Sequence, residues 1–240
     1  MQIITVAIQR GGTAKTTTAA AIAQAAAYRG YKALAIDLDP QGNLSFAMAA
    51  DTSRKNAFDL FNGTPAAATI QHTPCGADII PASWNLSTIT TSRGSANRLR
   101  DALQPIKNKY DYIIIDTPPT AGELQYNALQ AATGLIIPLA ADVFGLQGLY
   151  QIADTAEQFK ALTIKGIVFT RHNARSTLAK QMQATITNAA ASLNIPFLTA
   201  IRDGIAIREA QTLQQSIYEY APNSKPAADY LQLFDLIAEG

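Results

Sequence analysis

The chain has 240 residues, of which 48% are hydrophobic and 15% charged, with a formal net charge of +1. This length and apolar content suit one large domain, residues 1–240, and the near-neutral charge excludes a polycation that binds nucleic acid over its whole surface. Its one cysteine, Cys75, excludes disulfide bonds within the chain, and no apolar stretch approaches the roughly 18–20 residues of a membrane span, so we expect a cytoplasmic protein.

Short apolar runs alternate with helical patterns along the whole chain. Apolar runs without polar alternation are typical of strands buried on both faces of a parallel sheet. The alternation predicts a doubly wound α/β fold, with a mostly parallel sheet and helices on both faces. The predicted strands are residues 3–8, 32–37, 77–80, 111–116, 134–139, 164–169 and 196–200. The predicted helices are residues 16–28, 43–50, 85–104, 123–132, 146–161, 176–193, 206–214 and 225–238.

The first strand leads into a glycine-rich segment with the pattern of a phosphate-binding loop. Residues 9–17 read Q-R-G-G-T-A-K-T-T and precede an alanine-rich helix. Glycines let backbone N–H groups turn toward an anion, and the N-terminus of the next helix points at the same place. Lysine would reach the β- and γ-phosphates, and the next hydroxyl would ligate Mg²⁺. The predicted nucleotide-binding residues are Gly11, Gly12, Thr13, Ala14, Lys15, Thr16 and Thr17.

This loop departs from the strict pattern G-x-x-x-x-G-K-[ST] at both glycine positions. Gln9 stands at the first and Ala14 at the second. We expect alanine to be tolerated at residue 14, because φ stays negative where a helix begins. The alternative is an ordinary strand-to-helix turn that happens to contain a lysine and a threonine.

Two further strands end in acidic residues. Asp37 and Asp39 follow the second predicted strand, and Asp116 follows residues 112–115. Ligands of open α/β sheets bind outside the carboxyl ends of the strands, so these acids should meet the phosphate loop. Thr16, Asp37 and Asp116 are the predicted Mg²⁺ site, with Asp116 in a Walker-B role. The alternative for each acid is a helix cap or an Asx-turn.

Together these motifs resemble those of the ParA-type partition ATPases. The family opens with K-G-G-x-x-K-T-T, matched by residues 10–17, and continues with D-x-D-P-Q-G-N, matched in full by residues 37–43. Its D-x-P-P motif matches residues 116–119. The family belongs with MinD and the nitrogenase iron protein to the deviant Walker A group. Because the first motif begins at residue 10, the chain resembles the small, Soj-like members, and we expect no N-terminal helix-turn-helix domain.

The resemblance implies a reaction and partners. It implies ATP and Mg²⁺ as cofactors, an ATP-bound homodimer that binds DNA without sequence preference on the nucleoid, and a ParB-like centromere-binding protein that stimulates hydrolysis. Lys15, Asp39 and Arg10 would be catalytic, Asp39 by orienting the attacking water. Arg10 replaces the family's signature lysine, which reaches the phosphates of the partner subunit. Arginine keeps the charge but changes reach and shape, so the hydrolysis rate stays open.

Basic residues gather in one part of the sequence. Between residues 160 and 208 the only acid is Asp203. The candidates for DNA contact there are Arg175, Lys180, Arg202 and Arg208, and a second cluster consists of Arg93, Arg98, Arg100, Lys107 and Lys109. The alternative for both groups is an ordinary solvated surface.

Other functions remain open at this point. The chain could be a MinD-like or cargo-positioning ATPase, or a nucleotide-gated binding module in which Arg10 has abolished hydrolysis. The C-terminal helix is mainly acidic, and its apolar face comprises Tyr230, Leu231, Phe234 and Ile237. An interfacial membrane helix prefers basic residues, so we expect this helix to pack on the domain and the protein to have no membrane contact. Trp84, Phe58 and Phe61 are also expected to be packing residues.

Overall fold

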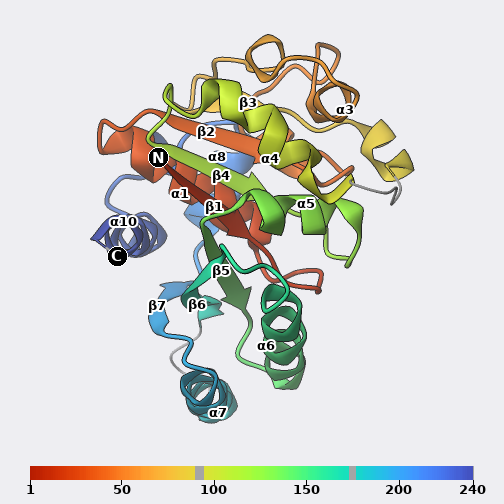
Figure 1. Cartoon of the computed structure of the whole chain (residues 1–240). Coiled ribbons are helices and arrows are strands. Elements are labelled where there is room, and N and C mark those ends of the chain that lie inside the picture. Colours follow the sequence, from red (N-terminus) through yellow and green to blue (C-terminus); the bar gives the residue numbers. More distant parts are fainter. Residues whose placement is uncertain (90–94, 173–176, 240) are drawn as a thin grey trace.

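The structure is a computed structural model that describes residues 1–89, 95–172 and 177–239, and it contains one parallel seven-stranded sheet (Figure 1). The strands lie in the order β3-β2-β4-β1-β5-β6-β7, and every neighbouring pair is parallel. Their bounds are β1 Gln2–Val6, β2 Ala33–Asp37, β3 Asp78–Ile80, β4 Tyr112–Asp116, β5 Gly134–Leu139, β6 Thr163–His172 and β7 Phe197–Arg202. The predicted fold class and all seven predicted strands are confirmed.

Helices connect the strands. The longer ones are α1 Lys15–Tyr28, α5 Glu123–Ala131, α6 Val143–Ala156, α7 Thr177–Ser192, α8 Ile205–Thr212 and α10 Lys225–Glu239. The shorter ones are α2 Asn43–Ala47, α3 Ala57–Phe61, α4 Arg98–Leu103 and α9 Ile217–Tyr220. Four 3₁₀ turns add η1 Ala66–Ala68, η2 Trp84–Thr88, η3 Ser95–Asn97 and η4 Gln104–Ile106. The segment before β3 contains η1 and an isolated antiparallel bridge between Gln71 and Ile79.

The predicted helix at residues 85–104 is wrong. The structure has the short turn η2 at its start and η3 and α4 near its end, with residues 90–94 outside the described part. In η2 the hydroxyls of Ser87 and Thr88 donate to the carbonyls of Trp84 and Asn85, at 2.8 and 2.7 Å. Serine and threonine favour such local bonds over a continuing helix, and this stretch is rich in both.

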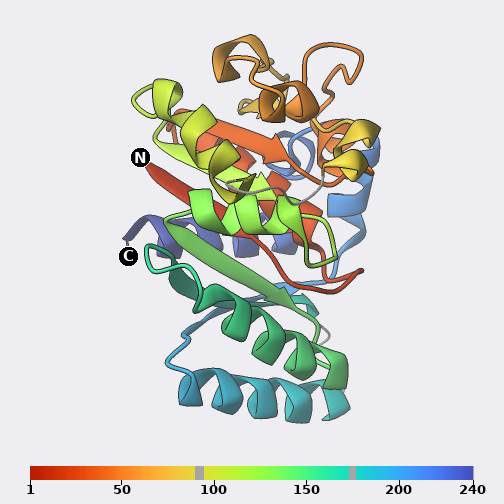
Figure 2. The same ribbon diagram turned by 45° about the vertical axis from the view of Figure 1, so that its right-hand side comes forward.

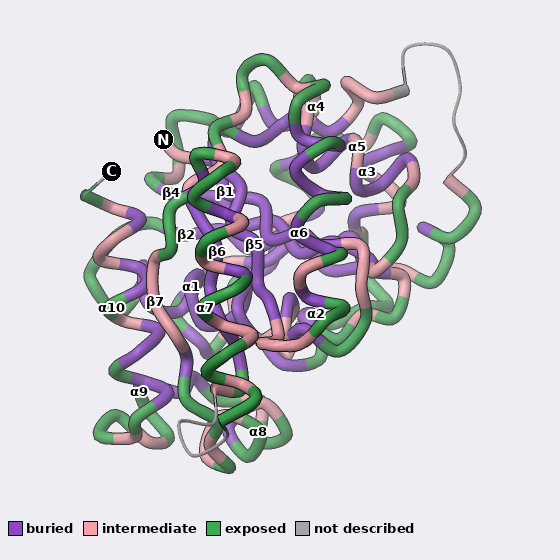
Figure 3. The backbone as a smooth tube through the Cα atoms, turned by 90° about the horizontal axis from the view of Figure 1, so that it is seen from below, coloured by how far each residue is buried: buried purple, intermediate pink, exposed green. Residues whose placement is uncertain are grey.

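Alternation along the strands divides the core between the two faces of the sheet. On β4, Ile114 packs with α1 and α10, whereas Ile113 and Ile115 pack with α3, α4 and α5. Beyond β1, the corresponding face of β5 and β6 packs with α6 and α7, which lie side by side (Figure 2). The strands are accordingly buried throughout the centre of the molecule (Figure 3).

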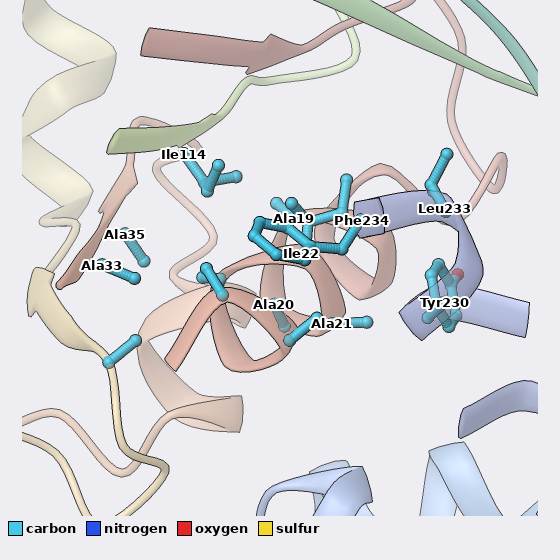
Figure 4. Close-up of a cluster of buried hydrophobic side chains, with 14 of the residues drawn as sticks. Ala19, Ala20, Ala21, Ile22, Ala33, Ala35, Ile114, Tyr230, Leu233 and Phe234 are labelled. Atoms are coloured by element: carbon cyan, nitrogen blue, oxygen red, sulfur yellow. The ribbon is translucent and has the colours of Figure 1, made fainter. Parts of the chain in front are cut away.

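Small side chains bring α1 close to the sheet. Seven alanine and isoleucine side chains of this helix are at most 2% exposed: Ala19, Ala20, Ala21, Ile22, Ala23, Ala25 and Ala26. The C-terminal helix α10 packs against α1 and β7, with Tyr230 and Phe234 buried in the same cluster (Figure 4). The expected packing of the C-terminal helix is therefore confirmed. This packing holds α1 in place and, with it, the phosphate loop that leads into the first turn of α1.

One predicted packing residue is not buried. Phe61 is buried and Phe58 half-buried, but the Trp84 side chain is 66% exposed at the start of η2. In the part of the chain that the structure describes, we find no helix with the length and apolarity needed to cross a membrane.

Candidate functional site

The phosphate loop lines a cavity of about 660 Å³ at the carboxyl edge of the sheet. All seven predicted nucleotide-binding residues, Gly11 to Thr17, line it, together with Asp39, Gln41, Pro119, Arg171 and Arg208. They come from the segments after β1, β2 and β4, from the end of β6 and from α8. The topology therefore brings together most of the residues that the motifs predicted.

The loop contains two left-handed residues before α1 begins. Gly12 has φ +75° and Ala14 has φ +60°. The expectation of a negative φ at Ala14 is thus wrong. The positive φ explains why the usual pattern has glycine at this position. A left-handed non-glycine residue costs about 1–2 kcal/mol. No side chain caps α1 at Ala14, so the N–H groups of its first turn are available to an anion.

Lys15 lies inside the loop that surrounds it. Its side chain is 7% exposed, and its Nζ donates to the carbonyl oxygen of Arg10 at 2.7 Å. Burial lowers the pKa of this ammonium, while Asp116 and Asp39 act in the opposite direction. A phosphate in the cavity would supply the anionic partner that the lysine lacks.

Of the three predicted acidic residues, Asp39 lines the cavity, whereas Asp37 and Asp116 are fully buried and are not among its lining residues; the three also differ in their bonding. Both oxygens of Asp37 are used, by the N–H of Asp39 and by the N–H and hydroxyl of Ser45. Asp39 is 8% exposed, lines the cavity and accepts the N–H of Gln41 at 3.0 Å. Asp116 accepts the N–H of Thr117, but its Oδ2 is buried and has no hydrogen-bond partner among the described residues.

Burial makes Asp37 and Asp116 reluctant to ionise. Desolvation raises the pKa of Asp37 to about 6, partly offset by the bonds from Ser45. Desolvation, followed by the neighbouring charge of Asp37, raises the pKa of Asp116 well above its ordinary value. A cation at this place would favour the ionised forms of both.

The residues present fit a Mg²⁺ ion that is only partly held by protein. Thr16 lies close enough to Asp116 to favour its ionised form, and the unpartnered Oδ2 of Asp116 is available as an oxygen ligand. No group of three or more His, Cys, Asp or Glu side chains in the described ranges could hold a metal. Mg²⁺ commonly binds one or two protein ligands, with water and substrate phosphates completing the octahedron.

We expect Asp116→Asn to stabilise the ligand-free protein at neutral pH. An unfolded carboxyl group loses its proton near pH 4, whereas in the folded chain burial raises the pKa of Asp37 to about 6 and that of Asp116 well above its ordinary value. The contribution of Asp37 and Asp116 to the free energy of unfolding is therefore fully present below pH 4 and is lost as the pH rises. The free energy of unfolding, measured in urea at pH 5 and at pH 7.5, should decrease less between these two pH values in the variant than in the wild type. Equal decreases would contradict this assignment.

Arg10 is held within its own chain. Its guanidinium donates to both carboxylate oxygens of Asp142, at 2.6 and 2.9 Å, and lies 5.2 Å from the ring centre of Phe144. Asp142 also caps α6 by accepting the N–H of Gly145 at 2.7 Å. The bond from Arg10 lowers the pKa of Asp142. Phe144 and Val143 beside it are 64% and 66% exposed, an apolar surface next to the phosphate loop.

The predicted DNA-contact residues are in different situations. Arg175 lies outside the described residues, as does Arg93 of the second cluster. Lys180 is exposed on α7. Arg202 donates to both oxygens of Asp229, at 2.9 and 2.5 Å, and Arg208 lies on the cavity, 4.0 Å from Asp203.

Sequence reasoning missed three contributors to the site. Asp142 holds Arg10, Thr170 bonds to the phosphate loop, and Gln211 of α8 accepts a bond from Thr17 at 3.4 Å. Asp142 stands at a strand-to-helix junction, which was a usable signal for a cap. Nothing local indicated the other two contacts, because they join segments 157 and 194 residues apart.

Comparisons with known proteins agree with this geometry. Residues 1–168 match the family model described as an AAA domain. The chain is 33% identical to the chromosome-partitioning ATPase Soj of Thermus thermophilus over 96% of this chain and 92% of that protein. It is 34% identical to the chromosome partitioning protein ParA of Caulobacter vibrioides, over 76% of this chain and 74% of that protein. Cobyrinic acid a,c-diamide synthase from Mycobacterium smegmatis, solved with ADP and magnesium, has a TM-score of 0.85 at 27% identity, covering 99% of this chain and 94% of that one.

Proposed function

Since this chain belongs to the family of the chromosome-partitioning ATPases Soj and ParA, we propose that it is an ATPase whose ATP-bound homodimer binds DNA without sequence preference. In this proposal hydrolysis resets the protein and is stimulated by a ParB-like centromere-binding partner. One observation carries the ATPase part: Lys15 and Asp39 line one cavity beside an uncapped helix N-terminus, and the buried Asp116 lies near enough to Lys15 to act on its pKa.

The residues of the cavity divide the chemistry between them. Lys15 moves its ammonium from the Arg10 carbonyl to the β- and γ-phosphates, while the first-turn N–H groups of α1 bind the phosphate oxygens. Thr16 and Asp116 would hold Mg²⁺, which neutralises the charge that develops on the phosphates. Asp37, the third predicted metal residue, already accepts bonds at both oxygens from Asp39 and Ser45, so in this proposal it holds those two residues in place of the ion. Asp39 orients the attacking water.

We expect Arg10→Ala to keep ATP binding in the monomer and to lose the ATP-dependent dimer. Arg10 belongs to the loop but points to Asp142 and Phe144, at a surface with exposed apolar side chains. In the dimer its guanidinium would leave Asp142 and contact the nucleotide of the partner subunit. Light scattering with and without ATP measures the change. A variant that still dimerises would show that Arg10 has no role across the interface.

The matched control is Arg29→Ala. Arg29 also forms a two-bond ion pair, with Asp235, but at the exposed end of α1 away from the cavity. The Arg29→Ala variant should therefore form the ATP-dependent dimer as the wild type does. Loss of the dimer in both variants would indicate general destabilisation and would remove the support for Arg10.

The DNA-binding part of the proposal rests on the charge of the segment from residue 160 to residue 208. A monomer would offer too few phosphate contacts for tight binding, and the dimer doubles them, so dimerisation alone can act as the switch. Arg175, Lys180, Arg202 and Arg208 remain the proposed contacts. Arg202 would bind a DNA phosphate while it remains paired with Asp229, because its side chain is still 44% exposed in that ion pair.

Reversing the charge of Arg175 and Lys180 together should greatly weaken DNA retention while leaving ATP-dependent dimerisation unchanged. Each phosphate contact contributes about −0.9 to the slope of log affinity against log salt concentration. Two residues in each subunit of the dimer make four contacts, so the slope should become shallower by about 3.6. DNA retention at several salt concentrations measures this. Unchanged binding would move the DNA face elsewhere, with Arg98, Arg100, Lys107 and Lys109 tested next.

The alternatives make different predictions. A MinD-like ATPase would hydrolyse ATP without binding DNA, and the packed, mainly acidic α10 does not favour its membrane contact. A cargo-positioning ATPase would act over the nucleoid with a cargo protein in place of the centromere-binding partner. A nucleotide-gated module would bind ATP and DNA without releasing phosphate. DNA retention with and without ATP separates the proposal from the MinD-like function, and phosphate release separates it from the nucleotide-gated module.

A further inference from the structure

Helix α8 packs against the domain through few buried side chains. Of its eight residues only Ala210 is buried, although Arg208, Gln211 and Thr212 line the phosphate cavity. Elements with few buried contacts open locally at low cost in free energy. The position of α8 against its neighbours therefore depends on the polar contacts at its ends.

The carboxyl end of α8 has a glutamine where glycine is usual. The N–H of Gln214 donates to the carbonyl oxygen of Gln211 at 3.1 Å. The next N–H, of Gln215, donates to the carbonyl oxygen of Ala210 at 2.9 Å, and these two bonds form a Schellman motif. Gln214 has the left-handed φ of +56° that the motif requires. Glycine adopts this φ without strain, so a glutamine kept here should make a contact that glycine cannot.

That contact is with α2, the short helix after Asp39. The Nε2 of Gln214 donates to the carbonyl oxygen of Phe46 at 3.0 Å. The buried thiol of Cys75 lies between the same two segments, with its Sγ 3.6 Å from the carbonyl oxygen of Gln214 and 3.9 Å from that of Ala47. We call these contacts the α2–α8 clasp.

A short run of hydrogen bonds connects α2 to Asp39. The N–H of Phe46 donates to the carbonyl oxygen of Gly42, and the N–H of Gly42 donates to the carbonyl oxygen of Asp39, both at 2.9 Å. A second support of α2 is Ser45, whose N–H and hydroxyl donate to Asp37. The turn that carries the Asp39 carboxylate is therefore held through α2, which has a buried support at Asp37 and an exposed one at the clasp.

Resting on the proposed role of Asp39 in hydrolysis, we propose that Gln214 is a positioning residue for Asp39. Through Phe46 it holds the turn after β2 in the place from which Asp39 orients the attacking water. ATP binding does not need this contact, because Lys15 and the N–H groups of α1 bind the phosphates. A displacement of about 1 Å at a reacting group can slow a reaction by about 10²-fold, so the rate is more sensitive to the clasp than the affinity is.

The test uses two variants that lose the hydrogen-bond donor in different ways. Gln214→Gly removes the amide and accepts the left-handed φ, so the fold is kept. Gln214→Glu keeps the length of the side chain, but its carboxylate has no N–H to donate to Phe46. In both we expect single-turnover phosphate release to slow about 3- to 10-fold, the worth of one such hydrogen bond, with ATP affinity within about twofold of the wild type. Hydrogen exchange at the amides of Gly42 and Phe46 should become faster.

Asn194→Gly is the matched control. Asn194 is also left-handed, with φ +57°, and follows α7 in a Schellman motif of its own, in which the N–H of Ile195 donates to the carbonyl oxygen of Ala190 at 2.8 Å. It lies before the amino end of β7, away from the cavity. This variant should change neither phosphate release nor ATP affinity.

Asp39→Ala is measured beside these variants. If it releases phosphate at the wild-type rate, the role of Asp39 fails and the role of Gln214 fails with it. If Asp39→Ala is slow, three results would each overturn the positioning role alone: a wild-type rate in either Gln214 variant, equal losses of rate and ATP affinity in both, or an equally slow Asn194→Gly.

Discussion

Replacing Asp39 by alanine is expected to slow ATP hydrolysis by about 10²–10⁴-fold while ATP binding persists. Asp39 is the cavity acid that is neither fully enclosed nor consumed by internal bonds, since it is 8% exposed and accepts one N–H, from Gln41. It can therefore face a water at the terminal phosphate. Single-turnover phosphate release, together with equilibrium binding of ATP, separates the two effects.

The matched variant is Asp39→Asn. Asparagine keeps an oxygen that can accept the N–H of Gln41, so the turn after β2 is preserved. It removes only the negative charge, and its hydrolysis should be almost as slow as that of the alanine variant. Normal turnover in either variant would leave Asp39 with a role in the turn alone.

Replacing Lys15 by alanine is expected to weaken ATP binding by about 10²-fold or more. Removing one partner of a buried charge pair costs about 2–5 kcal/mol, and this lysine is 7% exposed with its ammonium inside the loop. Equilibrium binding of a labelled ATP analogue measures the loss. Because the ligand-free lysine bonds only to the Arg10 carbonyl among the described residues, the fold should tolerate the change.

Lys32→Ala is the control for Lys15. Lys32 is exposed and precedes β2, at the amino edge of the sheet, so its loss should leave ATP binding unchanged. Unchanged affinity in Lys15→Ala would contradict the phosphate-loop assignment. Equal losses in both variants would indicate an effect of overall charge instead.

Much of this architecture is readable from the sequence because buried parallel strands are written as continuous apolar runs. The three isoleucines before Asp116 predicted both a central strand and the place of an acid at its carboxyl end. Short helices were harder. The capping pair of Asn56 and Asp59 starts α3, but a five-residue helix has too little periodicity to be recognised.

The parts of the site that escaped prediction depend on backbone angles or distant contacts. The left-handed conformation of Ala14 was missed, although the glycine that the usual pattern has at this position was a usable signal for a positive φ. The partner of Arg10 is 132 residues away and was not predicted, although Asp142 has the position of a helix cap. Trp84 lies in a short turn, where its exposure has no periodic signal.

The most direct test of the proposed function is fluorescence anisotropy of labelled duplex DNA titrated with the protein in ATP, in ADP and without nucleotide. We predict binding in ATP only, with equal affinity for two unrelated sequences and a steep decrease as salt rises. Binding that is the same in all three nucleotide conditions, or no binding in ATP, would contradict the account of an ATP-switched, DNA-binding dimer.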